Sequence, residues 1–200
     1  MNQRILGCLA LVLFLIPKPG YTATDPLETL RGPVTQAVDI LADPRYKAPD
    51  AKDEQTRKLR ALVDQVFDFT EISRRTLARG WLRFSPDQRR EFTDLFSRLL
   101  TDVYISRIQG NYSGQKVAFG TQSVEGDRAV VKSQVLREGI QTPVDYSLHM
   151  VDGNWRVYDV RVEGVSLVKN YRDQFRQILL NKGPEDLIAQ VKKKLKEFNE

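Results

Sequence analysis

The sequence has few of the residues on which most enzyme chemistry depends. Its 200 residues include one cysteine, Cys8, and one histidine, His149. Because Cys8 lies in an N-terminal apolar stretch that we expect to be removed, the remaining chain has no thiol, which excludes disulfides and thiol catalysis. One histidine with scattered carboxylates does not supply the ligand cluster of a metal site. We therefore expect neither a metal nor a cofactor.

Catalytic sequence motifs are missing as well. The chain has no glycine-rich phosphate loop, no Gly-x-Ser-x-Gly elbow and no His-Glu-x-x-His pair. His149 stands between Leu148 and Met150 in an alternating segment, which places it on the opposite, less apolar face of a strand. We expect a structural or exposed histidine there rather than a catalytic one.

A long apolar run occurs only at the N-terminus. Met1 to Arg4 form a short basic start, and Ile5 to Ile16 form an apolar run that is shorter than the roughly 20 residues needed to span a membrane. This pattern is typical of a secretory signal peptide, which we assign to residues 1–23, followed by one domain over residues 24–200. Most of the apolar run follows Cys8, whereas a lipoprotein signal has its apolar region before the cysteine, so a lipoprotein signal is not favoured.

Positive charge is only mildly in excess of negative charge. The formal net charge is +5, and it becomes +3 when Arg4 and Lys18 of the signal are removed. The basic surplus is concentrated at Lys192 to Lys194 and at Lys196. These lysines are expected to form a solvated helix face, although an anionic membrane or an acidic partner would also suit them. A nucleic-acid partner is not expected for an exported protein of this charge.

Apolar residues follow a helical period through the first half of the chain. A helix is predicted to start at Pro33, because proline is tolerated in the first turn of a helix and not in its middle. A second helix is predicted up to Phe67 and a short third one after the cap Asp68. The clearest start is at Ser85, which is followed by proline, an acid and a glutamine and then by a long amphipathic stretch.

The period changes from 3.6 to 2 in the second half of the chain. The alternation predicts strands at residues 116–124, 128–137, 142–151 and 155–163. Short turns join them, so neighbouring strands should pair antiparallel. Two helices follow, one capped by Ser166 and one starting at Gly183 and Pro184. The order predicts an α+β fold with a four-stranded, curled antiparallel meander and helices packed on one face.

The strand from Trp155 to Glu163 is apolar on both faces near its middle, so it should be buried on both sides. It also carries two acids, Asp159 and Glu163, on one face. One interpretation makes one of them a general base with a raised pKa in an apolar pocket, as in curled-sheet isomerases and dehydratases. The favoured interpretation has Asp159 hydrogen-bonded to backbone or to an arginine, because no second catalytic group is nearby. An enzyme that uses Asp159 on a small apolar substrate is the alternative.

Two blocks of sequence carry a resemblance to a known family. The segment from Trp155 to Phe175, which includes Asp-Val-Arg-Val-Glu-Gly-Val-Ser, resembles the signature of the MlaC family. The segment from Phe67 to Trp81, followed by Ser85-Pro-Asp-Gln, is similar to the family's helix and its helix start. The likeness covers residues 33 to 198. The MlaC family comprises periplasmic phospholipid-binding components of an ABC-transporter lipid pathway, also called toluene-tolerance auxiliary proteins.

The resemblance implies a soluble periplasmic carrier and no enzyme. Family members hold a phospholipid by its acyl tails in a cavity between sheet and helices, and shuttle it between an outer-membrane lipoprotein complex and an inner-membrane transporter complex. Exposing two tails of roughly 16 carbons costs on the order of 25 kcal/mol, at about 0.8 kcal/mol for each methylene. The cavity walls must therefore be apolar and continuous.

Ten residues are predicted to line that cavity. Five come from the segment that resembles the family: Val157, Val160, Val165, Val168 and Tyr171. Five are chosen from spacing alone: Tyr104, Ile108, Val144, Tyr146 and Leu148. No catalytic residue is predicted.

Overall fold

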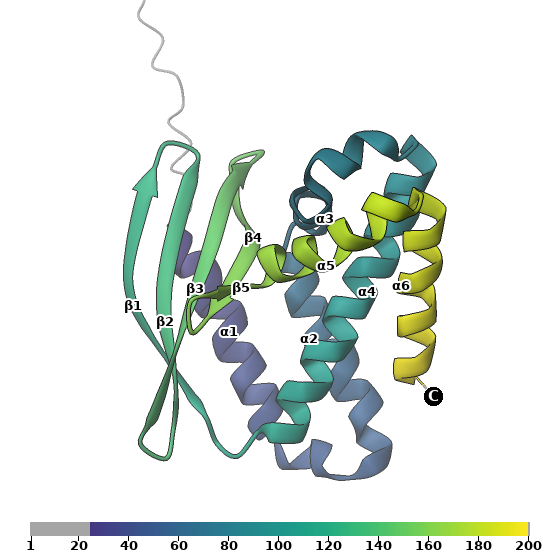
Figure 1. The fold of residues 1–200 in the computed structure, drawn as a ribbon. Helices are drawn as coiled ribbons and strands as arrows, with labels where there is room; N and C mark the ends of the chain where they lie inside the picture. The colour runs from purple at the N-terminus through teal and green to yellow at the C-terminus, as the bar shows by residue number, and fades with distance from the viewer. Residues whose placement is uncertain (1–24, 200) are drawn as a thin grey trace, which may run out of the picture.

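The computed structural model describes residues 25–199, and the signal peptide predicted for residues 1–23 lies outside them. A sheet forms one layer and a group of helices forms the other (Figure 1). The helices are α1 (Pro26–Ala42), α2 (Lys52–Val66), α3 (Phe69–Leu77), α4 (Pro86–Asn111), α5 (Leu167–Asn181) and α6 (Pro184–Asn199). The strands are β1 (Lys116–Glu125), β2 (Arg128–Arg137), β3 (Ile140–Val151), β4 (Asn154–Val162) and β5 (Val165–Ser166). The predicted α+β class and element order are confirmed.

Short 3-10 helices connect several of these elements. They span Pro44–Lys47, Pro49–Ala51 and Ala78–Arg83. Within residues 25–199, no helix combines the length and the apolar character that crossing a membrane requires.

The sheet is an antiparallel meander with one more strand than the sequence predicts. The strand order is β1-β2-β3-β4-β5. After β4 the chain turns back at Glu163 and Gly164, both of which have positive φ, and β5 pairs Val165 with Val162. The prediction missed β5 because a strand of two residues has no period to detect. Ser166 then caps α5 as predicted, its side chain accepting a hydrogen bond from the backbone N–H of Lys169.

The strand register gathers apolar side chains on one face, which we call the inner face. Tyr146 of β3 lies opposite Val131 of β2 and Val160 of β4, and Leu148 lies opposite Val157. The register shifts between Ser147 and Leu148, so β4 has one extra residue there. This β-bulge keeps Val157 and Val160 on the same face although they are three residues apart.

A second β-bulge interrupts β1, the outer strand of the sheet. Phe119 pairs with Ser133, whereas Gln122 pairs with Val131. Two residues of β1, Gly120 and Thr121, therefore lie opposite Lys132 alone. Such a bulge bends the strand and increases its twist.

The helices are arranged around the inner face and along the β4 edge of the sheet. Helix α1 contacts β1 and β2, while α2, α3 and α5 contact β4. Helix α4 packs on α2, α3 and α6. Between α2 and α3, Phe67 forms a parallel bridge with Val157, and the backbone N–H of Asp68 donates to the carbonyl of Val157 at 2.9 Å. The chain thus crosses from one helix to the next along the edge of β4.

Helix starts follow local capping chemistry. Helix α4 begins with the predicted capping box, in which Ser85 and Gln88 exchange side-chain to backbone hydrogen bonds of 2.9 and 3.2 Å. The predicted start of the first helix at Pro33 is wrong. Helix α1 begins at Pro26, where the Asp25 carboxylate accepts from the backbone N–H of Leu27 at 2.9 Å, and it continues through Pro33. Asp25 as the N-cap and Pro26 in the first turn provide the same helix-start signal seven residues before Pro33.

Two groups of buried apolar residues form the core. The helical cluster joins α3, α4, α5 and α6, and its largest members are Phe92, Phe96 and Phe175. The sheet cluster joins α1, α2 and the inner face, and includes Leu30, Val131, Leu148, Trp155 and Val157. Phe67 packs against both clusters, so the crossing from α2 to α3 links them.

Candidate functional site

The five predicted wall residues on β3 and β4 share the inner face. Val144, Leu148 and Val157 are buried, and Leu148 and Val157 belong to the sheet cluster. Tyr146 and Val160 pack against that cluster and are only partly buried. The inner face is therefore fully covered at Leu148 and Val157 and less covered towards Val160.

The other five predicted residues, four on helices α4 and α5 and Val165 on β5, fall into two groups. Val168 is buried in the helical cluster, and Tyr104 and Tyr171 pack against it while keeping partial exposure. The ring of Tyr171 lies 5.0 Å from the ring of Phe96, measured between centroids. Ile108 and Val165 are 49% and 65% exposed. The structure brings Tyr104, Tyr171 and Val168 to one cluster and leaves the other two at the surface.

Helix α1 contributes an apolar stripe that the wall prediction omitted. Leu30 is buried in the sheet cluster, and residues four, eight and eleven positions later share its side of the helix. These residues, Val34, Val38 and Leu41, are apolar but only partly buried. Their helical spacing is visible in the sequence, and it is the signal that would have found them.

Tyr146 on the inner face combines a buried hydroxyl with a partly exposed side chain. Burial raises the pKa of its hydroxyl, and a hydrogen bond with Ser133 acts in the opposite direction. The Ser133 hydroxyl in turn donates to the carbonyl of Val144 at 3.0 Å. Although protein surrounds the hydroxyl, the side chain of Tyr146 keeps part of its surface exposed. Tyr146 is therefore enclosed at its hydroxyl and partly accessible elsewhere along its side chain.

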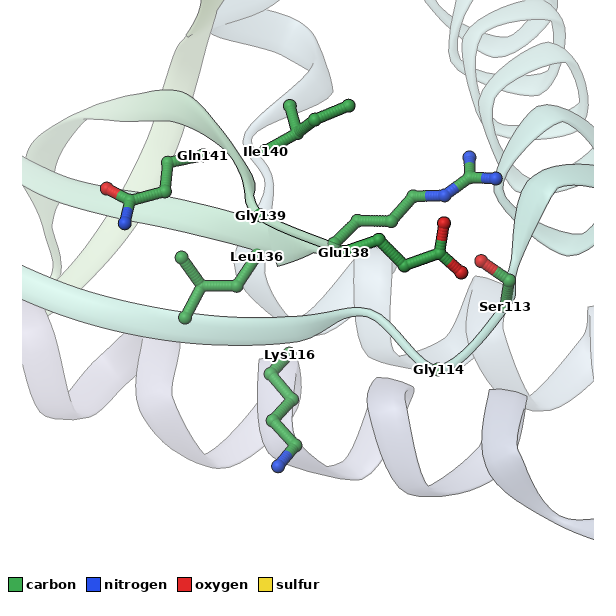
Figure 2. Close-up of a pocket in the computed structure, with 9 residues that line it drawn as sticks. Ser113, Gly114, Lys116, Leu136, Glu138, Gly139, Ile140 and Gln141 are labelled. Atoms are coloured by element: carbon green, nitrogen blue, oxygen red, sulfur yellow. The ribbon is translucent and has the colours of Figure 1, made fainter.

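Two open pockets lie away from the predicted wall. The first, of about 340 Å³, is formed by the link between α4 and β1 and by the turn between β2 and β3 (Figure 2). Figure 2 shows the side chain of Glu138 directed towards Ser113, so the lining includes charged and polar groups. The second, of about 460 Å³, lies around Asp152 and Arg156. Neither pocket is lined by any of the ten predicted residues.

Asp159 has the structural role favoured from the sequence. Its carboxylate accepts a hydrogen bond from the Ser166 hydroxyl at 2.7 Å and another from the backbone N–H of Val168 at 3.1 Å. The residue is 7% exposed and holds the start of α5 against β4. Both oxygens are engaged by the helix start, so neither is directed at a substrate site. Glu163 is exposed in the turn between β4 and β5.

His149 also has a structural environment. Its Nε2 atom lies 3.1 Å from a carboxylate oxygen of Asp68, the cap of α3, and its ring meets Tyr158 edge-on at 5.6 Å. The contact ties β3 to the start of α3. In the part of the chain that the structure describes, no group of three or more potential metal ligands comes together.

The fold and the site define a class of protein: an α+β domain in which helices cover an antiparallel sheet and several apolar side chains on both layers stay partly exposed. The chain belongs to the MlaC family, because the family model described as MlaC protein matches residues 32–193. The toluene tolerance protein ttg2D of Pseudomonas putida is 25% identical over 178 residues, which cover 88% of this chain and 82% of that protein.

A solved structure has the same fold. A phospholipid-binding protein from Ralstonia solanacearum, determined in complex with a phospholipid, superposes with a TM-score of 0.74 at 23% sequence identity. The superposition covers 88% of this chain and 99% of that chain. The match to the family model confirms the family resemblance found in the sequence.

Proposed function

We propose that the protein is a periplasmic phospholipid carrier. It holds the acyl chains of its ligand between the inner face of the sheet and the helices, and it shuttles lipid between outer-membrane and inner-membrane transport complexes. Residues 24–200 form its lipid-binding domain, and the preceding residues are the export signal.

The observation that carries the proposal is the incomplete coverage of three apolar surfaces. These are the α1 stripe, the inner face around Tyr146 and Val160, and the margin of the helical cluster at Tyr104 and Tyr171. A protein interior is normally packed to the density of an organic crystal. A hydrocarbon ligand requires accessible apolar side chains, and we propose that these three surfaces border one ligand space.

The family and its relatives support the same ligand class. The Ralstonia solanacearum protein that shares the fold was solved with a phospholipid, and the Pseudomonas putida relative is named for toluene tolerance. Acyl tails cannot leave an apolar site for water without a cost on the order of tens of kcal/mol. Delivery by docking onto membrane complexes avoids that cost, which is why we propose such complexes as partners.

The alternative, an enzyme that uses Asp159, has less support. A general base must reach the proton that it removes, whereas the carboxylate of Asp159 is occupied by Ser166 and Val168. The MlaC family assignment points to lipid transport as well.

Solvent extraction of the purified protein tests the proposal. The chain is expressed with its own export signal, purified without detergent, and extracted with organic solvent, and the extract is analysed by mass spectrometry. We expect a phospholipid at a fixed molar ratio to protein. An extract that contains no lipid, obtained from folded protein, contradicts the carrier proposal.

A further inference from the structure

The 3-10 helix Ala78–Arg83 lies against the C-terminal end of α5. The guanidinium of Arg83 donates to the carbonyl of Leu179 at 2.6 Å and to that of Lys182 at 3.2 Å. A Cβ on Gly80 would lie only 2.8 Å from the Cδ1 atom of Leu179, so the two segments are in close contact there. Helix α3 also contacts α5 (Figure 1). Residues of α3, the 3-10 helix and α5 therefore form one continuous surface.

Two leucines on the contacting segments are directed to the solvent. Leu82 of the 3-10 helix is 79% exposed and Leu180 of α5 is 64% exposed. Side chains three positions apart eclipse in a 3-10 helix, so Gly80 and Arg83 share the side that meets α5. By the same rule, Arg79 and Leu82 share another side. Because one exposed leucine is ordinary but two on contacting segments form a patch, the pair indicates a surface that another molecule covers.

Cations accompany both leucines. Arg79 shares the side of Leu82 and is exposed. On α5, Leu180 follows Arg176 by four positions and Lys169 by eleven, so the three lie on one side of the helix, and all are exposed. Arg79, Lys169 and Arg176 form no salt bridge within residues 25–199. Their charges are therefore not neutralised by the protein.

We call this surface the basic face, and it comprises Arg79, Leu82, Arg83, Lys169, Arg176 and Leu180. Arg83 donates to carbonyls and keeps its full charge. Asp173 lies on the same part of α5 and is exposed, but the four cations outnumber this carboxylate. At the corner between α5 and α6, Lys182 is followed by Glu185 and Asp186, so the corner is not part of the basic face.

We propose that the basic face binds the surface of a membrane that contains anionic lipids, with Leu82 and Leu180 inserted among the headgroups. Cations near an anionic bilayer are attracted to it, and apolar side chains that enter the headgroup region leave water. The inference goes beyond the proposed carrier function. It makes the bilayer itself a binding partner, and it does not depend on a lipid held inside the protein.

The shape of the basic face favours a bilayer over an acidic protein. Its leucines protrude, and neither of the two open pockets includes a residue of the face. A protein partner would need a preformed socket for each leucine, whereas the headgroup region of a bilayer deforms around them. The long side chains of lysine and arginine can lie along apolar surface while their charged ends stay among the headgroups.

Sedimentation with vesicles tests the inference. The protein as purified is mixed with vesicles of phosphatidylcholine alone, or of phosphatidylcholine and phosphatidylglycerol, and the bound fraction is measured after centrifugation. Wild-type protein is expected to bind the mixed vesicles at least about tenfold more tightly, because each cation near an anionic surface adds about a factor of five. Added salt should weaken this binding.

Two double variants separate the charges from the leucines. Arg79→Gln/Arg176→Gln should weaken binding to the mixed vesicles by roughly twentyfold. Leu82→Ser/Leu180→Ser should weaken it by roughly tenfold and keep its salt dependence. Both variants change exposed side chains, so circular dichroism should show the wild-type fold.

Lys193→Gln/Lys194→Gln is the matched control, because it removes the same charge from exposed positions of α6. It should bind the mixed vesicles within about twofold of wild type, since charges far from the bilayer are screened. Equal losses in this control and in Arg79→Gln/Arg176→Gln overturn the inference, because binding would then follow total charge.

The remaining outcomes are equally decisive. Wild-type protein that does not bind the mixed vesicles, as expected of a face that docks an acidic protein, overturns the inference. Binding that is undiminished in Leu82→Ser/Leu180→Ser overturns the insertion of the leucines. Lipid extracted from the same preparations tests the carrier function separately. Protein that carries no lipid but binds the mixed vesicles overturns the carrier proposal and supports the basic face.

Discussion

The helical cluster and the α1 stripe are both apolar, but the helical cluster is closely packed and the α1 stripe is partly exposed. In the helical cluster, Phe96 lies 5.4 Å from Phe92 and 5.2 Å from Phe175 between ring centroids, and all three are at most 2% exposed. On α1, Val34 and Val38 stay partly exposed. One region buries its apolar surface within the protein, and the other leaves surface that a ligand can cover. Apolar periodicity alone does not distinguish the two.

Side-chain size accounts for part of this difference. Aromatic rings fill the helical cluster and make edge-on contacts that add to their burial. The side chains along the α1 stripe are smaller, and include Val34, Ala37 and Val38. Smaller side chains reach less far and fill less of the space around the helix.

The largest effect is expected from truncating the same residue type in the two regions. Leu99→Ala should lower the free energy of unfolding by about 2–5 kcal/mol, because Leu99 is buried in the helical cluster and the change leaves a cavity. Leu41→Ala on α1 should cost only about 1 kcal/mol, since its side chain is partly exposed already. Urea unfolding followed by circular dichroism measures both. Equal losses would show that the two regions are packed alike.

The next effect concerns Asp159, which joins the sheet to α5. Asp159→Ala should lower the free energy of unfolding by about 1–3 kcal/mol, because the Ser166 hydroxyl and the Val168 N–H lose their acceptor. Asp173→Ala, on the exposed side of α5, serves as the control and should change stability by no more than about 0.5 kcal/mol. Bound lipid per folded protein should stay at the wild-type level in both variants. Loss of lipid from stable, folded Asp159→Ala would place this residue in the ligand site.

A substitution that fills the proposed lipid-binding space should change stability little and lipid binding strongly. Val38→Trp on α1 should remove most of the co-purifying lipid. Its cost in unfolding free energy should stay below the roughly 1–3 kcal/mol of overpacking a filled core. Thr35→Trp places the same ring on the exposed side of α1 and should leave the lipid content unchanged. If Val38→Trp unfolds the protein, the stripe faces packed protein and the comparison between the regions fails.

The smallest effect is a pH dependence at Glu71, in the rigid part of the molecule. Partial burial acts to raise its pKa, but Arg74 and Arg75 outweigh burial and bring the pKa below its ordinary 4.5. The folded protein therefore holds this proton less tightly than the unfolded chain. The stabilisation is complete above pH 4.5 and is lost as the pH falls through the lowered pKa.

Urea unfolding between pH 7 and pH 3 measures this dependence. Glu71→Gln should flatten the acid limb of the stability curve. Glu28→Gln, which removes an exposed pair with Arg31, should leave the curve as it is in wild-type protein. An acid limb that is the same with and without Glu71 would rule out this source of pH dependence.

Several features of the fold could be predicted because they depend on local sequence. The Ser85 capping box, the Ser166 cap and the change of period at Lys116 each involve a few neighbouring residues, and each is found in the structure. Strand β5 and the continuation of α1 through Pro33 could not be predicted. The first depends on pairing with β4, and the second on a helix start at Asp25 that competes with the later proline.

The candidate site could be predicted only in part. Alternation correctly placed Val144, Tyr146 and Leu148 on a common face of one strand. It could not show that Val165 would be exposed in β5, because coverage depends on which helices lie over each end of the sheet. The α1 stripe was omitted although its helical spacing is visible in the sequence, because spacing alone does not show that a helix face is left partly exposed. Periodicity defines which side chains share a face, and only the tertiary arrangement defines how completely that face is covered.

The bulge in β1 has a consequence for how the protein behaves at high concentration. In the described sheet β1 is an outer strand, with β2 as its hydrogen-bonded neighbour, and it is ten residues long with little charge. A flat edge of this kind invites a strand from a second molecule to pair with it and begin aggregation. The β-bulge at Gly120 and Thr121 breaks the regular spacing of backbone N–H and C=O groups along that edge. A foreign strand would find no continuous ladder there, which keeps the chains apart.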